Sequence, residues 1–241
     1  MSKPILIILP GWGGTRESWK NFINLAEAEF DVRCIELPGF GNEPCPAEVW
    51  GVEDYANFVK NKINGLGIGK KIILAHSFGG QVATYLVGNN PHICDTLVLS
   101  GPAIFRKKHS LRRIIFWPIA KLGALVFHIW PLSKLKVQAR RLLYKAADSP
   151  DYSQTSGRLR QIFQKVTTQS MAAWLPKISV PTLVVAGKMD TFVPSSISRK
   201  AAAEIPNAKF VEFSGLRHGL HQSQPAELLK TIIEFIKSHV V

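Results

Sequence analysis

The six residues Ala75-His76-Ser77-Phe78-Gly79-Gly80 join an apolar run, 71–75, to a helical pattern over 78–88. A chain that turns sharply from a strand into a helix needs small residues two before and two after the turn residue, because neighbouring backbone crowds those places. Ala75 and Gly79 meet this need, and Ser77 would then project from the turn. The pattern predicts a strand, a tight turn and a helix, with Ser77 as a candidate nucleophile. The alternative is a purely structural serine in a tight turn.

Outward from this turn, short β-branched runs alternate with amphipathic helical patterns on both sides along the chain. Several of the runs are apolar at every position, which is typical of parallel strands covered by helices on both faces. The sequence therefore predicts an α/β fold with a doubly wound, mostly parallel sheet. The expected strands are 5–9, 32–37, 71–75, 96–100, 182–186 and 209–213, and the expected helices are 15–29, 52–64, 78–88, 195–205 and 225–239.

One third of the chain carries the whole excess of positive charge. The 241 residues have a formal net charge of +13. Residues 103–177 contain fifteen Lys and Arg against two acids, whereas the remainder has fifteen of each. This stretch shows only helical patterns, at 118–129, 134–145 and 156–168. We predict a basic, all-helical cap at 103–177, inserted between the two parts of the core, 1–102 and 178–241.

Composition excludes several classes of protein. The three cysteines, Cys34, Cys45 and Cys94, form no CxxC pair and suggest neither a disulfide framework nor a zinc site, so a reducing compartment is expected. The apolar run at 5–9 is too short for the core of a signal peptide, and no stretch supplies the roughly 20 apolar residues of a membrane span. We therefore expect a cytoplasmic protein.

A serine nucleophile needs an imidazole to take its proton and a carboxylate to orient that imidazole. Asp190 lies just past the end of an expected strand, where open α/β sheets place their sites, and His218 lies in the loop before the last helix. Ser77, Asp190 and His218 are therefore the predicted triad. His221 is the alternative base, and Asp95 is a weaker rival for Asp190 because it precedes its strand.

Five motifs together resemble the α/β-hydrolase family, in the same order and over nearly the whole chain. Besides the Ser77 turn, they are Pro10-Gly11-Trp12-Gly13-Gly14, Glu36-Leu37-Pro38-Gly39-Phe40-Gly41, Gly187-Lys188-Met189-Asp190 with Val193-Pro194, and Arg217-His218. The sequence departs from the family at Pro10, Glu36 and Arg217, where many members have His, Asp and Gly. None of these departures removes a catalytic group.

The transition state of acyl transfer places negative charge on the former carbonyl oxygen, which fixed N–H donors stabilise. The backbone amides of Trp12, in the glycine-rich turn, and Phe78, at the start of a helix, are the predicted donors. The cap is rich in aromatic side chains, most of which are expected to fill its own core. We predict that Phe127 and Trp130 line the substrate pocket.

These observations predict a serine hydrolase that cleaves carboxylic esters and needs no metal or organic cofactor. Within the family, the compact core and helical cap look similar to carboxylesterases of the pimeloyl-carrier-protein methyl ester type. The same triad also serves thioesterases, carbon–carbon bond hydrolases and cofactor-free haloperoxidases, and a non-catalytic binding protein or a membrane-peripheral lipase are further alternatives.

Three explanations of the basic stretch stay open. It attracts an anionic ester or an acidic carrier protein, it binds an anionic membrane surface, or it has no role beyond solvation. Nucleic acid is not an expected partner, because no recognisable binding module accompanies the charge. The oligomeric state cannot be inferred from the sequence.

Overall fold

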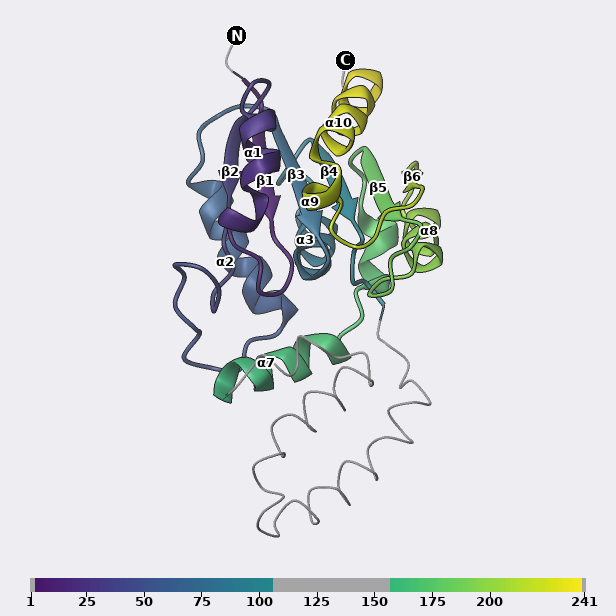
Figure 1. The fold of residues 1–241 in the computed structure, drawn as a ribbon. Helices are drawn as coiled ribbons and strands as arrows, with labels where there is room; N and C mark the ends of the chain where they lie inside the picture. The colour runs from purple at the N-terminus through teal and green to yellow at the C-terminus, as the bar shows by residue number, and fades with distance from the viewer. Residues whose placement is uncertain (1–2, 106–156, 240–241) are drawn as a thin grey trace, which may run out of the picture.

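The structure is a computed structural model that describes residues 3–105 and 157–239. Within these residues the core is a six-stranded sheet, and each pair of neighbouring strands is parallel (Figure 1). The strand order is β2-β1-β3-β4-β5-β6, so the chain extends the sheet first on one side of β1 and then on the other, which is typical of a doubly wound sheet. The strands are β1 (Ile5–Leu9), β2 (Asp31–Cys34), β3 (Lys71–His76), β4 (Thr96–Ser100), β5 (Thr182–Gly187) and β6 (Lys209–Phe213).

Burial follows the position of each strand in the sheet. Every residue of β1, β4 and β5 is buried, because helices cover both faces of these strands. The edge strands β2 and β6 are only partly buried. The apolar runs of the sequence therefore become inner strands, which confirms the prediction of a mostly parallel α/β sheet.

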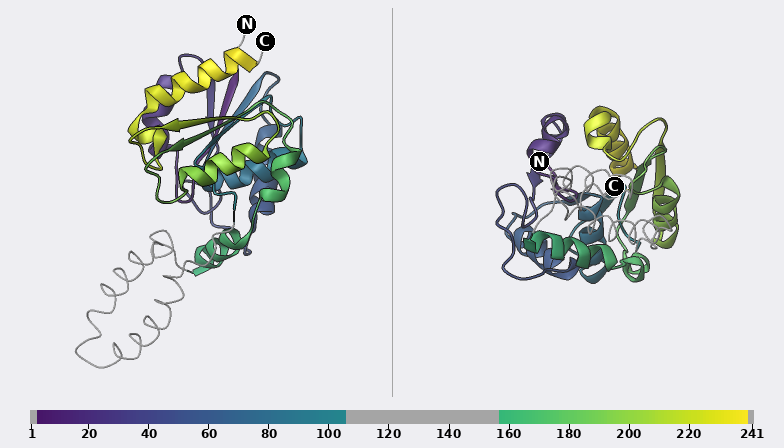
Figure 2. Two further views of the ribbon diagram at one scale, coloured as in Figure 1. Left: turned by 90° about the vertical axis from the view of Figure 1, so that its right-hand side faces the viewer. Right: turned by 60° about the horizontal axis from the view of Figure 1, so that its bottom comes forward.

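Helices cover the sheet in two layers (Figure 2). The core on one face includes side chains of α2 (Val52–Asn64), α3 (Phe78–Asn89) and α8 (Ser195–Glu204). The core on the other face includes side chains of α1 (Lys20–Ala26) and α10 (Pro225–His239), together with Leu220 of the short α9 (Leu220–Ser223). Side chains of β1 alternate between the two cores, so that Ile7 faces the first and Ile8 the second.

Helix α7 (Gly157–Thr168) lies across the edge of the sheet at which the strands end (Figure 1). Its attachment is polar as well as apolar: Ile162 and Val166 are buried, and the side-chain amide of Gln81 donates to the carbonyls of Val166 and Gln169, at 3.0 and 2.9 Å. The 3₁₀ helix η3 (Ala172–Lys177) packs against α3 and α8. The helix expected at 156–168 is thus present, whereas those expected at 118–129 and 134–145 lie outside the described residues.

The structure corrects three details of the expected elements. The helix expected over 15–29 is a 3₁₀ turn, η1 (Glu17–Trp19), followed by α1, which ends at Ala26 as the chain turns to bury Phe30. The strand expected over 32–37 ends at Cys34. The helix α9 was not predicted, because four residues are too short to show a period. No helix among the described residues is long and apolar enough to cross a membrane.

Candidate active site

Ser77 lies between β3 and α3 with φ of 53° and ψ of −112°. Backbone in such a sparsely populated region costs a non-glycine residue about 1–3 kcal/mol. Three backbone hydrogen bonds hold it there: the Ser77 N–H donates to Ser100 at 3.0 Å, and its carbonyl accepts from Gln81 at 3.1 Å and Ala103 at 3.0 Å. Strain that the surrounding structure maintains is common at functional sites, and it marks Ser77 as a candidate nucleophile.

The small residues around Ser77 are needed for the reason that the sequence suggested. A Cβ atom on Gly79 would overlap the carbonyl oxygens of Leu9 and Pro10. A Cβ on Gly11 would lie 3.1 Å from the Ser77 Cβ. The strand–turn–helix expected at Ser77 is therefore present, and the glycine-rich loop that follows β1 lies directly against it.

Asp190 and His218 form a hydrogen-bonded carboxylate–imidazole pair. Asp190 follows β5, and its side chain is 1% exposed. One carboxylate oxygen lies 2.6 Å from His218 Nδ1, and the other accepts the backbone N–H groups of Phe192 and Val193, at 2.8 and 2.9 Å. With Asp190 ionised, Nδ1 carries the proton and donates it to the carboxylate, which leaves the Nε2 lone pair as the basic site.

This pair lies beside the Ser77 turn. Gly101 directly follows Ser100, which holds the Ser77 N–H. A Cβ on Gly101 would come within 3.1 Å of His218 Nδ1 and 3.3 Å of the Asp190 carboxylate. From the other side, the ring of His76 lies 4.5 Å from the ring of His218, measured between centroids. The loops that follow β3, β4, β5 and β6 thus bring the predicted acid and base beside the turn that carries the predicted nucleophile.

His221, the alternative base, lies in a different environment. Its ring stacks on the indole of Trp19 at 3.8 Å and 8° between planes. It is buried, and its Nδ1 has no hydrogen-bond partner among the described residues. Burial, together with the charge of a protonated His218, lowers the pKa of His221 to about 4. The carboxylate of Asp190 pairs with His218, so the geometry favours His218 as the base.

His76 is a third buried imidazole, and it contacts both of the others. Its Nδ1 lies 2.9 Å from the carbonyl of Ser100, and its ring centroid is 4.9 Å from that of His221. Burial lowers the pKa of His76 well below its usual value, and His218 and His221 add to the effect. His76 is therefore neutral at neutral pH, and its ring packs against the rings of His218 and His221.

The predicted oxyanion donors belong to the two segments that adjoin Ser77, namely the glycine-rich loop and the start of α3. Phe78 is the first residue of α3, so its N–H has no intrahelical acceptor. Trp12 follows Gly11, which packs against Ser77. The Trp12 ring contacts Phe78, Phe40 and Phe163 of α7 edge to face, at 5.3, 4.9 and 5.0 Å between centroids. The rings of Trp12, Phe40, Phe78 and Phe163 therefore form an aromatic wall beside the position expected for the acyl group.

Glu36, which stands where many family members have Asp, joins two loops near the site. One carboxylate oxygen accepts the backbone N–H of Arg16 at 2.8 Å, and the other accepts that of Asn42 at 2.9 Å. Gly41 has a φ of +58°, and a Cβ there would overlap this carboxylate. Glu36 thus ties the end of the glycine-rich loop to the turn at 38–42.

Both predicted pocket residues, Phe127 and Trp130, lie outside the described residues. Within the described part of the chain, no three His, Cys, Asp or Glu side chains group as metal ligands would. Among the described residues, the candidate site consists of the Ser77 turn, the Asp190–His218 pair and the Trp12 loop.

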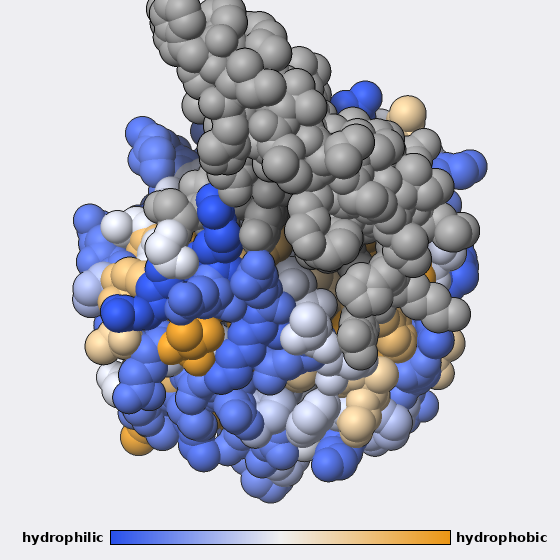
Figure 3. All heavy atoms as spheres, turned by 90° about the horizontal axis from the view of Figure 1, so that it is seen from below, coloured by the Kyte–Doolittle hydropathy of each residue, from blue (hydrophilic) through white to orange (hydrophobic). Residues whose placement is uncertain are grey.

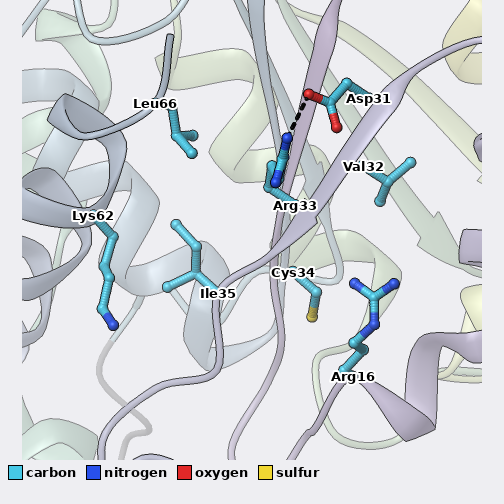
Figure 4. Close-up of a pocket in the computed structure, with 8 residues that line it drawn as sticks. All are labelled: Arg16, Asp31, Val32, Arg33, Cys34, Ile35, Lys62 and Leu66. Atoms are coloured by element: carbon cyan, nitrogen blue, oxygen red, sulfur yellow. Dashed lines mark hydrogen bonds and ion pairs between the residues drawn. The ribbon is translucent and has the colours of Figure 1, made fainter.

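Two open hollows lie apart from these residues, along the edge strand β2. The larger is about 480 Å³, and Arg33 donates to the Asp31 carboxylate within it at 2.9 Å (Figure 4). The smaller is about 210 Å³ and shares Cys34 with it. Burial raises the pKa of the Cys34 thiol to about 12, which leaves it protonated and unreactive. The larger is lined by Arg16, Asp31, Val32, Arg33, Cys34, Ile35, Lys62 and Leu66.

Sequence reasoning missed the packing around His218. The sequence indicates His221 only as an alternative base and gives no sign of its stacking on Trp19. No local pattern connects Trp19, His76 and His221, so only the packing of η1 and α9 at the end of β3 brings them together.

The comparisons with known proteins agree with this architecture. Residues 4–223 match the protein family described as the alpha/beta hydrolase fold. A pimeloyl-[acyl-carrier protein] methyl ester esterase from Aeromonas hydrophila subsp. hydrophila is 24% identical over 257 residues, which cover 97% of this chain and 95% of that protein. A bromoperoxidase from Bacillus anthracis superposes with a TM-score of 0.73 at 20% identity, over 98% of this chain and 92% of the other. A variant of the meta-cleavage product hydrolase CumD gives 0.71 at 20% identity, with the same coverage of both chains.

Proposed function

This chain belongs to the α/β-hydrolase fold family, and from that premise we propose that it is a serine hydrolase that cleaves carboxylic esters through an acyl-enzyme on Ser77. The observation that carries the proposal is the hydrogen-bonded Asp190–His218 pair beside a strained, tightly packed Ser77. A serine that served only as a turn residue would need neither the strain nor a buried carboxylate aligned on a neighbouring imidazole.

In the proposed reaction, the Ser77 hydroxyl oxygen attacks the ester carbonyl carbon while His218 Nε2 takes the hydroxyl proton. The tetrahedral intermediate then breaks the bond to the alcohol oxygen, which leaves with the proton returned by His218. Water attacks the acyl-enzyme by the same route, and the carboxylic acid departs as Ser77 regains its proton. Asp190 holds the Nδ1–H throughout and stabilises the imidazolium that forms in each half-reaction.

Trp12 and Phe78 are the proposed oxyanion donors. Both backbone amides are fixed before substrate binds, one in the loop that packs on Ser77 and one at the start of α3. Preorganised donors of this kind commonly contribute about 3–4 kcal/mol each to transition-state stabilisation. We also propose that Phe127 and Trp130 contact the substrate.

We further propose that the ester is anionic or carried by an acidic protein, that the enzyme is cytoplasmic, and that 103–177 is a cap. The name of the Aeromonas relative describes an ester carried on an acyl carrier protein. The described end of the basic stretch, 157–177, contains four Lys and Arg and no acid. Binding of an acidic partner there would weaken with added salt, because exposed charges are screened.

Labelling with a fluorophosphonate, followed by mass spectrometry of the adduct, tests the nucleophile. Label is expected on Ser77, and Ser77→Ala should lower ester turnover by a factor of about 10⁴ or more. Ser214→Ala removes an exposed hydroxyl and is the matched control. Label at another residue, or full turnover by Ser77→Ala, would overturn the assignment.

A matched substrate series tests the reaction class. The same acyl group offered as an ester, a thioester and a vinylogous diketone should be cleaved fastest as the ester. Faster turnover of the thioester or diketone would move the protein to a thioesterase or carbon–carbon hydrolase. Ester rates measured at two salt concentrations, with anionic and neutral acyl groups, test the proposed role of the basic stretch.

A further inference from the structure

Two exposed apolar side chains belong to the loop that carries Asp190. Met189 is 53% exposed and Phe192 is 41% exposed, on either side of the buried carboxylate. The carboxyl edge of the sheet shows apolar patches among hydrophilic residues (Figure 3). Other large apolar side chains that are similarly exposed, among them Leu25 of α1, lie outside the loops of the site. Apolar surface left open beside a catalytic pair is typical of a ligand-binding surface.

The position of Phe192 is fixed by the catalytic carboxylate itself. The Phe192 N–H donates to one oxygen of Asp190 at 2.8 Å, and His218 Nδ1 lies 2.6 Å from the other. The Phe192 ring lies against the His218 ring, 5.3 Å between centroids and tilted by 35°. The buried Asp190 carboxylate therefore positions both His218 and Phe192, whose exposed ring lies next to His218.

The chemistry of ester cleavage indicates which half of the substrate contacts the exposed surface of Met189 and Phe192. His218 must return its proton to the alcohol oxygen, so the alcohol half of the ester lies beside the imidazole. The carbonyl oxygen points instead toward the proposed donors, Trp12 and Phe78, where the aromatic wall with Phe163 stands. Phe192 contacts His218 and is thus next to the alcohol half.

We propose that Met189 and Phe192 form a leaving-group subsite that binds an apolar alcohol, so that the enzyme prefers esters of larger alcohols, such as butyl or benzyl alcohol, to methyl esters. A methyl group reaches little of this surface, whereas a benzyl or butyl group covers it and removes it from water. This inference rests on the proposed esterase function, and it adds a preference for the alcohol that the family and the triad leave open.

Methyl, butyl and benzyl esters of one acid test the proposal, because all three pass through the same acyl-enzyme and differ only in the alcohol. The benzyl ester should exceed the methyl ester in kcat/KM by about tenfold or more, the range expected for an apolar group in a pocket. Phe192→Ala should lower this benzyl-to-methyl ratio about tenfold, and Met189→Ala should lower it by less. Leu25→Ala, which trims an exposed apolar side chain away from the site, should leave the ratio unchanged.

The outcomes separate this inference from the function on which it rests. If wild type prefers the methyl ester, or if Phe192→Ala keeps the ratio while fluorophosphonate still labels Ser77, the subsite is refuted and the esterase stands. If no ester is cleaved by a route that requires Ser77, both proposals fail. Because the readout is a ratio of two substrates within one variant, a partly unfolded sample does not mimic the expected result.

Discussion

Lowering the pH should destabilise this fold through His221, whose burial fixes the size of the effect. His221 is 4% exposed, its ring stacks on Trp19 at 3.8 Å, and its Nδ1 has no partner among the described residues. Burial first, and the charge of His218 second, lower its pKa from 6.5 to about 4. The folded state therefore holds the neutral form, whereas the unfolded chain takes up a proton near pH 6.5.

The sign follows from which state binds more protons. Between pH 6.5 and about 4, the unfolded chain is protonated at His221 and the folded chain is not, so the free energy of unfolding falls as the pH falls. The contribution is fully present above pH 6.5 and fully lost near pH 4. A pKa difference of about 2.5, at 1.36 kcal/mol for each pKa unit, corresponds to about 3 kcal/mol.

Denaturant unfolding across this pH range measures the effect in wild type and in His221→Phe. Phenylalanine keeps an aromatic ring on Trp19 and removes the titrating group, so the variant should lose about 3 kcal/mol less than wild type between neutral and acid pH. His76 remains in both proteins and contributes to both curves. His92→Phe replaces an exposed imidazole and is the control. Parallel pH profiles for wild type and His221→Phe would refute the reasoning.

Two further substitutions test how the turn and its supporting loop are held. Gly79→Ala places a Cβ against the carbonyl oxygen of Leu9 and should lower the free energy of unfolding by about 1–3 kcal/mol. Gly67→Ala, whose added Cβ meets open space, should leave the free energy of unfolding unchanged. Thermal unfolding of the two variants measures the difference. Glu36→Gln removes the charge that strengthens the hydrogen bond from the Arg16 N–H, so it should lower the free energy of unfolding by about 1 kcal/mol. It should also slow fluorophosphonate labelling of Ser77. An unchanged melting temperature would contradict this prediction.

Much of the fold could be predicted because local signals agree with the tertiary structure. The strands at 5–9 and 96–100 and the helices at 52–64 and 225–239 begin and end where the sequence predicted. The two strands are largely apolar runs that lie buried on both faces, and the two helices carry a helical period that matches their burial. The expectation for 15–29 was less accurate, because the turn that buries Phe30 ends α1 at Ala26, and no pattern within the helix signals that turn.

The site divides in the same way. The turn at Ser77 could be predicted from sequence because the crowding around it demands small residues at fixed spacing, and the position of Asp190 could be predicted because it follows a strand end. The sequence predicts His218 as the partner of Asp190 from its place in the loop before the last helix, but it leaves His221 as an alternative because both imidazoles lie within one short segment. The two histidines are three residues apart, and the path of the backbone between them places His218 against the carboxylate and His221 on Trp19.

The three neighbouring imidazoles give the proposed reaction a defined place for its proton. A proton taken from Ser77 is stabilised on His218, because Asp190 lies 2.6 Å from Nδ1. Burial lowers the pKa of His76 and His221, which lack a carboxylate partner among the described residues, so neither competes for that proton. Two neutral rings can therefore pack closely around the one ring that must become charged, and they exclude water there without diverting the proton from the leaving group.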